Sequence, residues 1–309
     1  MQYNSHMKNK HLEHPEDSIL EGKDGLYKIL NFFKGKNSKL SVKYDGAPAI
    51  VWGINPENDK FFVGTKSVFN KVKIKINYTH YDIETNHGHT PGVASILHMC
   101  LEKLPRDGGV YQGDFIGFGG GKEYTPNTIT YKFNEDVEED IIVAAHTVYT
   151  GDTIKDSVAS FDCGKIASEE CKFLKTYASF WGRDYRIGLY MSLARVLSKY
   201  VTYPSKELGQ QLKQYINNYV RMGVEIDAKK IAKETGCSVN LIHLYNLVIE
   251  IKRLLMNGIL IEEDVKCFLG ENKSTHEGYV MTNKYGTYKL INREEFSHAN
   301  FTMEKKWDK

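Results

Sequence analysis

The sequence predicts an α+β fold in which two β-rich segments surround a block of helices. Residues 1–165 contain short runs of β-branched and aromatic residues between glycines, and residues 270–309 return to this pattern. Residues 166–269 instead carry long stretches in which apolar residues recur three and four positions apart. We therefore expect one domain of antiparallel sheets with flanking helices, formed by 1–165 and 270–309, and an all-helical module inserted at 166–269.

The first segment is expected to mix helices and strands. Pro15-Glu16-Asp17 is typical of a helix start. The strict alternation at 72–76 predicts a strand with one wet, basic face. Helices are expected at 18–34 and 91–104, and strands on both sides of Asp45-Gly46 within 40–52 and at 60–64, 72–78, 110–115 and 141–148.

The second segment is expected to be helical until strands return near its end. Segment 227–242 has the spacing of a helix–turn–helix, which leaves open a nucleic-acid-binding element or a plain helical hairpin. Ser205, Asp227 and Ser238 are expected to cap or break helices. Helices are expected at 169–200, 205–221, 228–235, 240–255 and 261–269, followed by strands at 278–282 and 287–291.

The composition is that of a globular protein with reduced thiols. Hydrophobic residues make up 41% and charged residues 26% of the chain, and no apolar run approaches the ~20 residues that span a bilayer. The first ten residues lack the apolar core of a secretory signal, so we expect a cytoplasmic protein. Five scattered cysteines without a CxxC pair predict free thiols and no zinc site. The net charge of +2 neither demands nor excludes a nucleic-acid partner.

The segment Lys43-Tyr44-Asp45-Gly46 places a lysine, an acid and a glycine after an apolar strand. A lysine amine attacks an electrophile only when burial or nearby cations lower its pKa. Asp45 could orient the amine or hold a metal ion, and Gly46 would let the backbone pass close to a ligand. The alternative is structural, because Asp-Gly between apolar strands is a strong hairpin signal.

Three further positions carry candidate chemistry. Asp114 follows a glycine in a predicted strand and could bind a ribose hydroxyl or a metal ion. Glu277 begins the strand-like segment 277–280, and Lys289 lies twelve residues later among apolar strand neighbours, where a lysine is unusual. Taken singly, each of the three has a surface or turn residue as its alternative interpretation.

Together these stretches resemble motifs I, III, IV and V of the covalent nucleotidyltransferases, which include ATP- and NAD-dependent polynucleotide ligases and mRNA capping enzymes. The resemblance is carried by Lys-x-Asp-Gly at 43–46, Gly-Asp at 113–114, Glu-Gly at 277–278 and the strand lysine at 289. Motif III usually has Glu where this chain has Asp114. The segments 11–17, 64–71 and 296–301 are similar to a family of uncharacterised phage proteins. That resemblance would place the protein in the cytoplasm of a host cell.

The resemblance implies a nucleotidyltransferase (ATP-grasp-like ligase) domain and roles for named residues. Lys43 would be the nucleophile, assisted by Asp45 and Lys289. The cofactors would be ATP and Mg²⁺, with Mn²⁺ as an alternative metal, and the metal would be held by Glu277 and Asp45. Nucleotide contacts are expected from Val42, Gly46, Lys66, Asp114, Phe133, Glu277 and Lys289.

Three details refine what the resemblance implies. The aromatic residue that stacks on the purine would be Phe133, or Tyr131 in the same segment. Many DNA ligases carry arginine two residues after the motif I glycine, where this chain has Pro48. Residues 290–309 are too few for the C-terminal OB-fold of DNA ligases and capping enzymes.

The implied activity is that of an ATP-dependent polynucleotide ligase. It would form a lysyl-AMP intermediate and seal 5′-phosphate to 3′-hydroxyl ends, with RNA rather than DNA as the favoured partner. One alternative is a capping-type or other end-modifying nucleotidyltransferase. Another is a nucleic-acid-binding protein that has the fold and performs no chemistry. The sequence predicts no membrane association and leaves the oligomeric state open.

Overall fold

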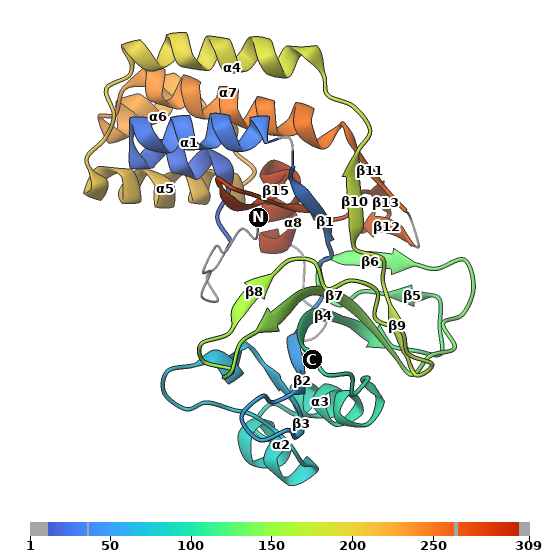
Figure 1. Cartoon of the computed structure of the whole chain (residues 1–309). Coiled ribbons are helices and arrows are strands. Elements are labelled where there is room, and N and C mark those ends of the chain that lie inside the picture. Colours follow the sequence, from blue (N-terminus) through green and yellow to red (C-terminus); the bar gives the residue numbers. More distant parts are fainter. Residues whose placement is uncertain (1–11, 36, 263–264, 303–309) are drawn as a thin grey trace.

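Within the part of the chain that the structure describes, three sheets and several helices form an α+β fold, as the sequence predicts (Figure 1). The computed structural model describes residues 12–35, 37–262 and 265–302. Most helices gather at one end of the molecule, and a smaller group of helices flanks the sheet at the other end (Figure 1). The five-stranded sheet lies between these ends and carries the lysine of motif I.

The five-stranded sheet joins strands from three distant parts of the sequence. Its order is β11 (Ile259–Ile261), β10 (Tyr177–Phe180), β1 (Lys39–Lys43), β14 (Gly278–Asn283) and β15 (Gly286–Ile291). All of these pairings are antiparallel. The strand expected before Asp45 within 40–52 and the strands expected at 278–282 and 287–291 are therefore confirmed, and they lie side by side.

The other two sheets have six and four strands. The six-stranded sheet has the order β3 (Phe61–Thr65), β2 (Ala49–Ile54), β4 (Val110–Phe118), β7 (Ile141–Thr150) and β8 (Val158–Ser160), with β9 (Cys171–Phe173) parallel to β7. The four-stranded sheet has the order β13 (Asn272–Ser274), β12 (Lys266–Leu269), β6 (Ile129–Lys132) and β5 (Glu123–Tyr124). Because β1 and β2 belong to different sheets, Asp45-Gly46 is not a hairpin turn.

The helices cap the sheets at both ends (Figure 1). The helical end contains η1 (Pro15–Glu21), α1 (Lys23–Lys34), α4 (Tyr185–Leu197), η3 (Ser198–Tyr200), α5 (Lys206–Arg221), α6 (Ala228–Thr235) and α7 (Val239–Met256), and α8 (Arg293–Thr302) contacts α5. The other end contains η2 (Lys66–Phe69), α2 (His80–His87) and α3 (Pro91–Lys103). Ser205 and Asp227 cap α5 and α6 with their side chains, as expected.

Two predictions for the first segment are wrong in detail. The helix expected at 18–34 is interrupted at Gly22, whose φ of 115° lies in the region that only glycine adopts readily. The strand expected at 72–78 does not form. Val72 and Ile74 are 77% and 52% exposed, and only Asn77 makes a bridge, to Val63. The extended backbone is broken at Lys73, whose φ is 57°, so the segment pairs with β3 only at Asn77.

The all-helical character expected for 166–269 is also wrong at both ends of that segment. The stretch expected to begin a helix at 169 forms β9 and β10, and the helix α4 starts only at Tyr185. The helix expected at 261–269 is replaced by β11 and β12. β10 pairs with β1 and with β11, and β12 pairs with β6. The segment therefore contributes to the sheets as well as to the helical end.

The region 227–242 forms two helices joined at Gly236, as both open alternatives require. α7 is the central helix of the helical end, and nine of its residues are buried, including Leu241, Ile242, Leu244 and Tyr245. A recognition helix needs a free face for the groove of DNA. The burial of α7 therefore favours the plain helical hairpin.

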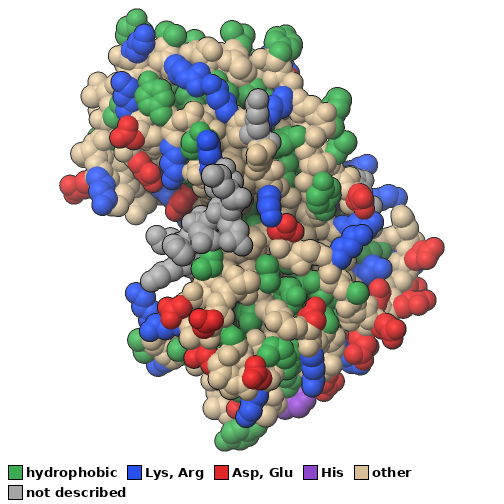
Figure 2. Space-filling view, viewed as in Figure 1, with side chains coloured by type: hydrophobic (Ala, Val, Ile, Leu, Met, Phe, Trp, Pro, Cys, Tyr) green, Lys and Arg blue, Asp and Glu red, His purple; other side chains and the backbone are tan. Residues whose placement is uncertain are grey.

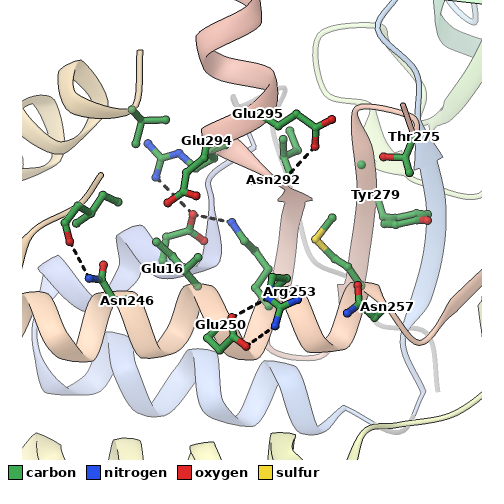
Figure 3. A pocket seen from close by; sticks show the side chains of 18 of the residues that line it. Glu16, Asn246, Glu250, Arg253, Asn257, Thr275, Tyr279, Asn292, Glu294 and Glu295 are labelled. Atoms are coloured by element: carbon green, nitrogen blue, oxygen red, sulfur yellow. Dashed lines mark hydrogen bonds and ion pairs between the residues drawn. The ribbon is translucent and has the colours of Figure 1, made fainter. Parts of the chain in front are cut away.

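A buried ionic cluster joins the start of the chain to α7 and α8. Glu16 is fully buried, and its Oε1 accepts hydrogen bonds from Lys252 Nζ (2.7 Å) and Arg293 Nη1 (3.4 Å). Tyr245 donates to Asp17 (2.7 Å) and accepts from Arg293 (2.8 Å). Burial acts to raise the pKa of Glu16, but the two cations outweigh it and hold this pKa below the ordinary value. Figure 3 shows Glu16 on the wall of a cavity between α7 and the start of α8.

The cysteines and the helices agree with two further predictions. Cys100, Cys171 and Cys267 are buried and all five cysteines are free thiols. Among the described residues, no helix has both the length and the apolar composition needed to cross a bilayer.

We predict that Glu16→Ala destabilises the protein by about 3–5 kcal/mol, because it leaves two buried cations without their shared anion. Equilibrium unfolding in urea measures this loss. Glu250→Ala is the matched control, since Glu250 pairs with Arg253 at the surface and its loss should cost about 0–1 kcal/mol. Because the pKa of Glu16 is lowered on folding, its contribution is present at neutral pH and is lost as the pH falls through the folded-state pKa. Equal losses for the two variants would contradict the prediction.

Candidate active site

The pairing of β1 with β14 brings Lys43 to Glu277. The antiparallel register places Lys43 opposite Gly278, so the neighbouring Glu277 lies at the end of the same strand pair. Lys43 Nζ donates a hydrogen bond to Glu277 Oε2 and forms an ion pair with it. These side chains are 28% and 12% exposed, so the pair is shielded but open to a ligand. Residues 234 positions apart thus meet at one point.

A cavity of about 540 Å³ surrounds this ion pair, within the range of small-molecule sites. Lys43 and Val42 enter it from β1, and Glu277 and Lys289 enter it from the β14–β15 hairpin. Lys66 enters from η2 and Asp114 from β4, in the six-stranded sheet. Six residues that the sequence singled out therefore line one cavity between two sheets.

Gly46 allows the two sheets to approach each other at the cavity. A Cβ atom on this residue would lie 2.7 Å from both Asp114 Cβ and the Phe115 carbonyl oxygen, closer than real side chains pack. The loop is fastened to β4 by hydrogen bonds from Ala47 N to Phe115 O (2.9 Å) and from Phe115 N to Pro48 O (3.0 Å). Gly46 therefore permits close packing, and it does not itself line the cavity.

The carboxylates around Lys43 keep its amine protonated. Burial acts to lower the pKa of Lys43, but the charges of Glu277 and Asp114 outweigh burial and raise this pKa above the ordinary lysine value. Burial raises the pKa of Glu277 above its usual range, against the opposing charge of Lys43. A ligand that takes over the carboxylates would remove the field that holds the proton on Lys43.

Asp114 and Lys289 both have pKa values below their ordinary values, for different reasons. Burial acts to raise the pKa of Asp114, but the nearby His146 ring and the charges of Lys43 and Lys66 bring it below the ordinary value. Burial lowers the pKa of Lys289, and the charge of Lys43 lowers it further. Two lysines crowded in one cavity repel each other, so an anion placed between them would be stabilised.

The structure gives Asp45 a structural role in place of the catalytic and metal-binding roles expected from the sequence. Its side chain is buried and does not line the cavity. Asp45 Oδ1 accepts from Asn127 Nδ2 (2.8 Å), and Oδ2 accepts from the backbone N–H groups of Thr128 (2.8 Å) and Ile129 (3.2 Å). Asp45 therefore fastens the loop after β1 to the start of β6.

The two aromatic residues expected to stack on the purine also lie elsewhere. Phe133 packs edge-on against Tyr124 with ring centroids 5.6 Å apart, outside the cavity. The Tyr131 hydroxyl is buried and accepts a hydrogen bond from the Asp45 backbone N–H (2.6 Å). Neither ring is placed to contact a ligand bound beside Lys43.

Sequence reasoning missed another set of residues that the cavity does contain. The rings of Phe69, Tyr149 and Phe161 line it in addition to Tyr44 of motif I, and the Phe69 and Tyr149 ring centroids are 4.5 Å apart. Tyr149 donates to Gln112 Oε1 (2.6 Å), and His146 lies 3.8 Å from Asp114. His146 is the extra residue of a β-bulge in β7, between Ala145 opposite Gly113 and Thr147 opposite Gln112, and it lines the same cavity as Thr147 and Tyr149. A strict period of two would have placed it on the other face, so no local signal could have found it.

The cavity of Lys43 contains carboxylates that could contribute to holding a metal ion. Among the described residues, no group of three or more His, Cys, Asp or Glu side chains is arranged to hold a metal. Glu277 and Asp114 do line the same cavity. Mg²⁺ is commonly held by one or two carboxylates together with substrate phosphates and water. Glu277 and Asp114 could therefore hold Mg²⁺ together with phosphates and water, whereas the Asp45 oxygens are engaged with Asn127 and the start of β6.

The second large cavity is the one shown in Figure 3, with a volume of about 600 Å³. It lies on the far side of β14, where Tyr279 lines it, while Val280 lines the cavity of Lys43. None of the expected site residues lines it.

A model of a family of unknown function, DUF6267, matches residues 9–235 and 225–305, which together span nearly the whole chain. No curated protein and no solved structure matches the chain.

We predict that the amine of Lys289 loses its proton at a lower pH than the amine of Lys43, because burial and charge repulsion act on the first and carboxylates stabilise the second. Acylation rates measured by mass spectrometry across a pH series give both midpoints. Glu277→Gln removes the anion nearest to Lys43 and should lower the Lys43 midpoint. The reverse order of midpoints, or an unchanged Lys43 midpoint in Glu277→Gln, would contradict this electrostatic description.

Proposed function

We propose that this chain, which belongs to the DUF6267 family, is an ATP-dependent polynucleotide ligase that carries AMP on Lys43. One observation carries the proposal: Lys43, Lys66, Asp114, Glu277 and Lys289 come from four separate parts of the sequence and line one cavity. The resemblance to covalent nucleotidyltransferases rests on four of these residues, and their convergence supports it.

The cavity offers complementary surfaces for the parts of a nucleoside triphosphate. Its lysines, Lys43, Lys66 and Lys289, suit the phosphates. Asp114 accepts hydrogen bonds and suits the ribose hydroxyls. The rings of Phe69, Tyr149 and Phe161 suit a purine face, since aromatic rings stack on bases with little dependence on sequence.

In the first step, Lys43 Nζ attacks the α-phosphorus of ATP. A P–N bond forms, the bond between the α-phosphorus and the bridging oxygen to the β-phosphate breaks, and pyrophosphate leaves. The Lys43 ammonium must first lose its proton to solvent, and its burial favours this loss once Glu277 and Asp114 are engaged by the ligand. Lys289 and Lys66 stabilise the negative charge that grows on the phosphate oxygens.

Mg²⁺, when bound with the nucleotide at Glu277 and Asp114, would supply charge neutralisation on the phosphates. The side chains of the protein act on the Lys43 amine. Glu277 holds the Lys43 ammonium in position, and the burial of Lys43 favours the neutral amine once the carboxylates are engaged.

In the later steps, AMP passes from Lys43 to a 5′-phosphate end, and a 3′-hydroxyl then displaces AMP and closes the phosphodiester. We favour RNA over DNA because Pro48 occupies the position at which many DNA ligases carry arginine. Proline offers no donor to a terminal phosphate, and its carbonyl is already bonded to Phe115.

We predict that incubation with α-labelled ATP and Mg²⁺ labels the native chain covalently and raises its intact mass by ~329 Da, the mass of one AMP phosphoramidate. Lys43→Ala and Lys43→Arg should abolish the label, since arginine keeps the charge and cannot act as the nucleophile. Lys284→Ala is the matched control, because Lys284 lies in the β14–β15 turn outside the cavity and its loss should leave labelling unchanged.

The other outcomes separate the alternatives. Labelling by GTP alone would replace the ligase with a capping-type enzyme. Absence of label with all four nucleotides and with both Mg²⁺ and Mn²⁺ would overturn the nucleotidyltransferase proposal. Preferential joining of 5′-phosphorylated DNA strands over matching RNA strands would overturn the preference for RNA.

A further inference from the structure

The outer face of α4 and η3 carries a continuous apolar stripe. Tyr185, Leu189, Leu193, Val196 and Tyr200 are 85%, 61%, 51%, 52% and 69% exposed. Their spacing of four, four, three and four residues matches the helical repeat, so they share one face. Single exposed apolar residues are ordinary, but five in register along one helix face indicate a surface that another molecule covers.

This stripe is not the face that anchors α4 to the protein. Ile187, Met191 and Ala194 are buried and form the opposite face, and α4 packs on α7. The helix is therefore apolar on two sides, while its own fold requires only one. The exposed side needs a separate explanation.

Two small residues lie beside the stripe. Gly188 is exposed inside the helix, and a Cβ atom there would meet nothing within 4 Å. Glycine at such a position costs about 1 kcal/mol relative to alanine, and no contact within the described chain requires it. Ser192 follows one turn later on the same side. Small residues one turn apart let a second helix approach closely.

The charges that flank the stripe are basic. Arg186, Arg195 and Lys199 lie on its two sides. Asp184 caps α4 and pairs with the Arg186 guanidinium (3.0 and 2.6 Å), so Arg195 and Lys199 carry the net positive charge of the border. Figure 2 shows hydrophobic and basic side chains along the edge of the molecule above the helical end, where Figure 1 places α4.

We propose that this face of α4 binds an amphipathic helix of a partner protein whose apolar side is bordered by acidic residues. Apolar side chains along a helix pack against apolar side chains that a facing helix carries at the same spacing. The basic flanks complement an acidic border. A second copy of this chain is disfavoured because the basic flanks of two such stripes would face each other. Nucleic acid is disfavoured because the two tyrosine rings lie at opposite ends of the stripe, and Leu189, Leu193 and Val196 between them offer neither stacking rings nor hydrogen bonds.

The test uses a labelled synthetic helical peptide with leucines along one face and glutamates on both borders, and a matched peptide with lysines in place of the glutamates. Fluorescence anisotropy with the full chain should give binding of the acidic peptide that is at least tenfold tighter than that of the basic peptide. Leu193→Asp should weaken the acidic peptide at least tenfold. Arg195→Glu combined with Lys199→Glu should reverse the preference between the two peptides.

Val72→Asp is the matched control, because Val72 is an exposed apolar residue outside the stripe (77%, against 51% for Leu193) and its change should leave peptide binding unaltered. Circular dichroism melting checks that every variant is folded. Three results would overturn the proposal: no binding of the acidic peptide, a dimer in sedimentation that Leu193→Asp separates into monomers, or binding of single-stranded RNA that Leu193→Asp abolishes.

Discussion

The ion pair between Lys43 and Glu277 is the contact on which the candidate site depends. Each partner lies at the end of its strand, and the antiparallel pairing of β1 with β14 sets the distance between them. A slip of one residue in this register would turn the side chains to the opposite face of the sheet. The register is therefore a chemical constraint as well as a structural one.

The helical end supports this register from behind. The largest apolar core runs from α1, α4, α5, α6 and α7 into the sheet that contains β1, β14 and β15. Within that core, Glu16 ties the start of the chain to Lys252 on α7 and to Arg293, two residues after β15. A buried charge whose partner is removed is costly, so the hairpin that carries Lys289 is held by interactions outside the cavity.

The strand β14 lines two cavities, one on each face of the sheet. Side chains alternate across a strand, so Val280 faces the cavity of Lys43 while Tyr279 faces the cavity beside α7. The exposed stripe on α4 lies on neither cavity. The molecule thus separates a charged interior site from an apolar outer surface.

The sequence by itself determined the α+β class, most strands of the first segment, the helices α3, α5, α6 and α7, and the residues that converge around Lys43, because these depend on local periodicity and on short motifs. Only the tertiary structure decided which of the acidic residues line the cavity of Lys43 and which hold the backbone. Asp45 lies in the motif but turns to the backbone of β6, where its hydrogen bonds are satisfied. Likewise, 171–180 forms strands because β7 and β1 offer free edges there, which no local pattern records. The aromatic wall of the cavity, with Tyr149 and Phe69, depends in the same way on strands and turns that meet only after folding.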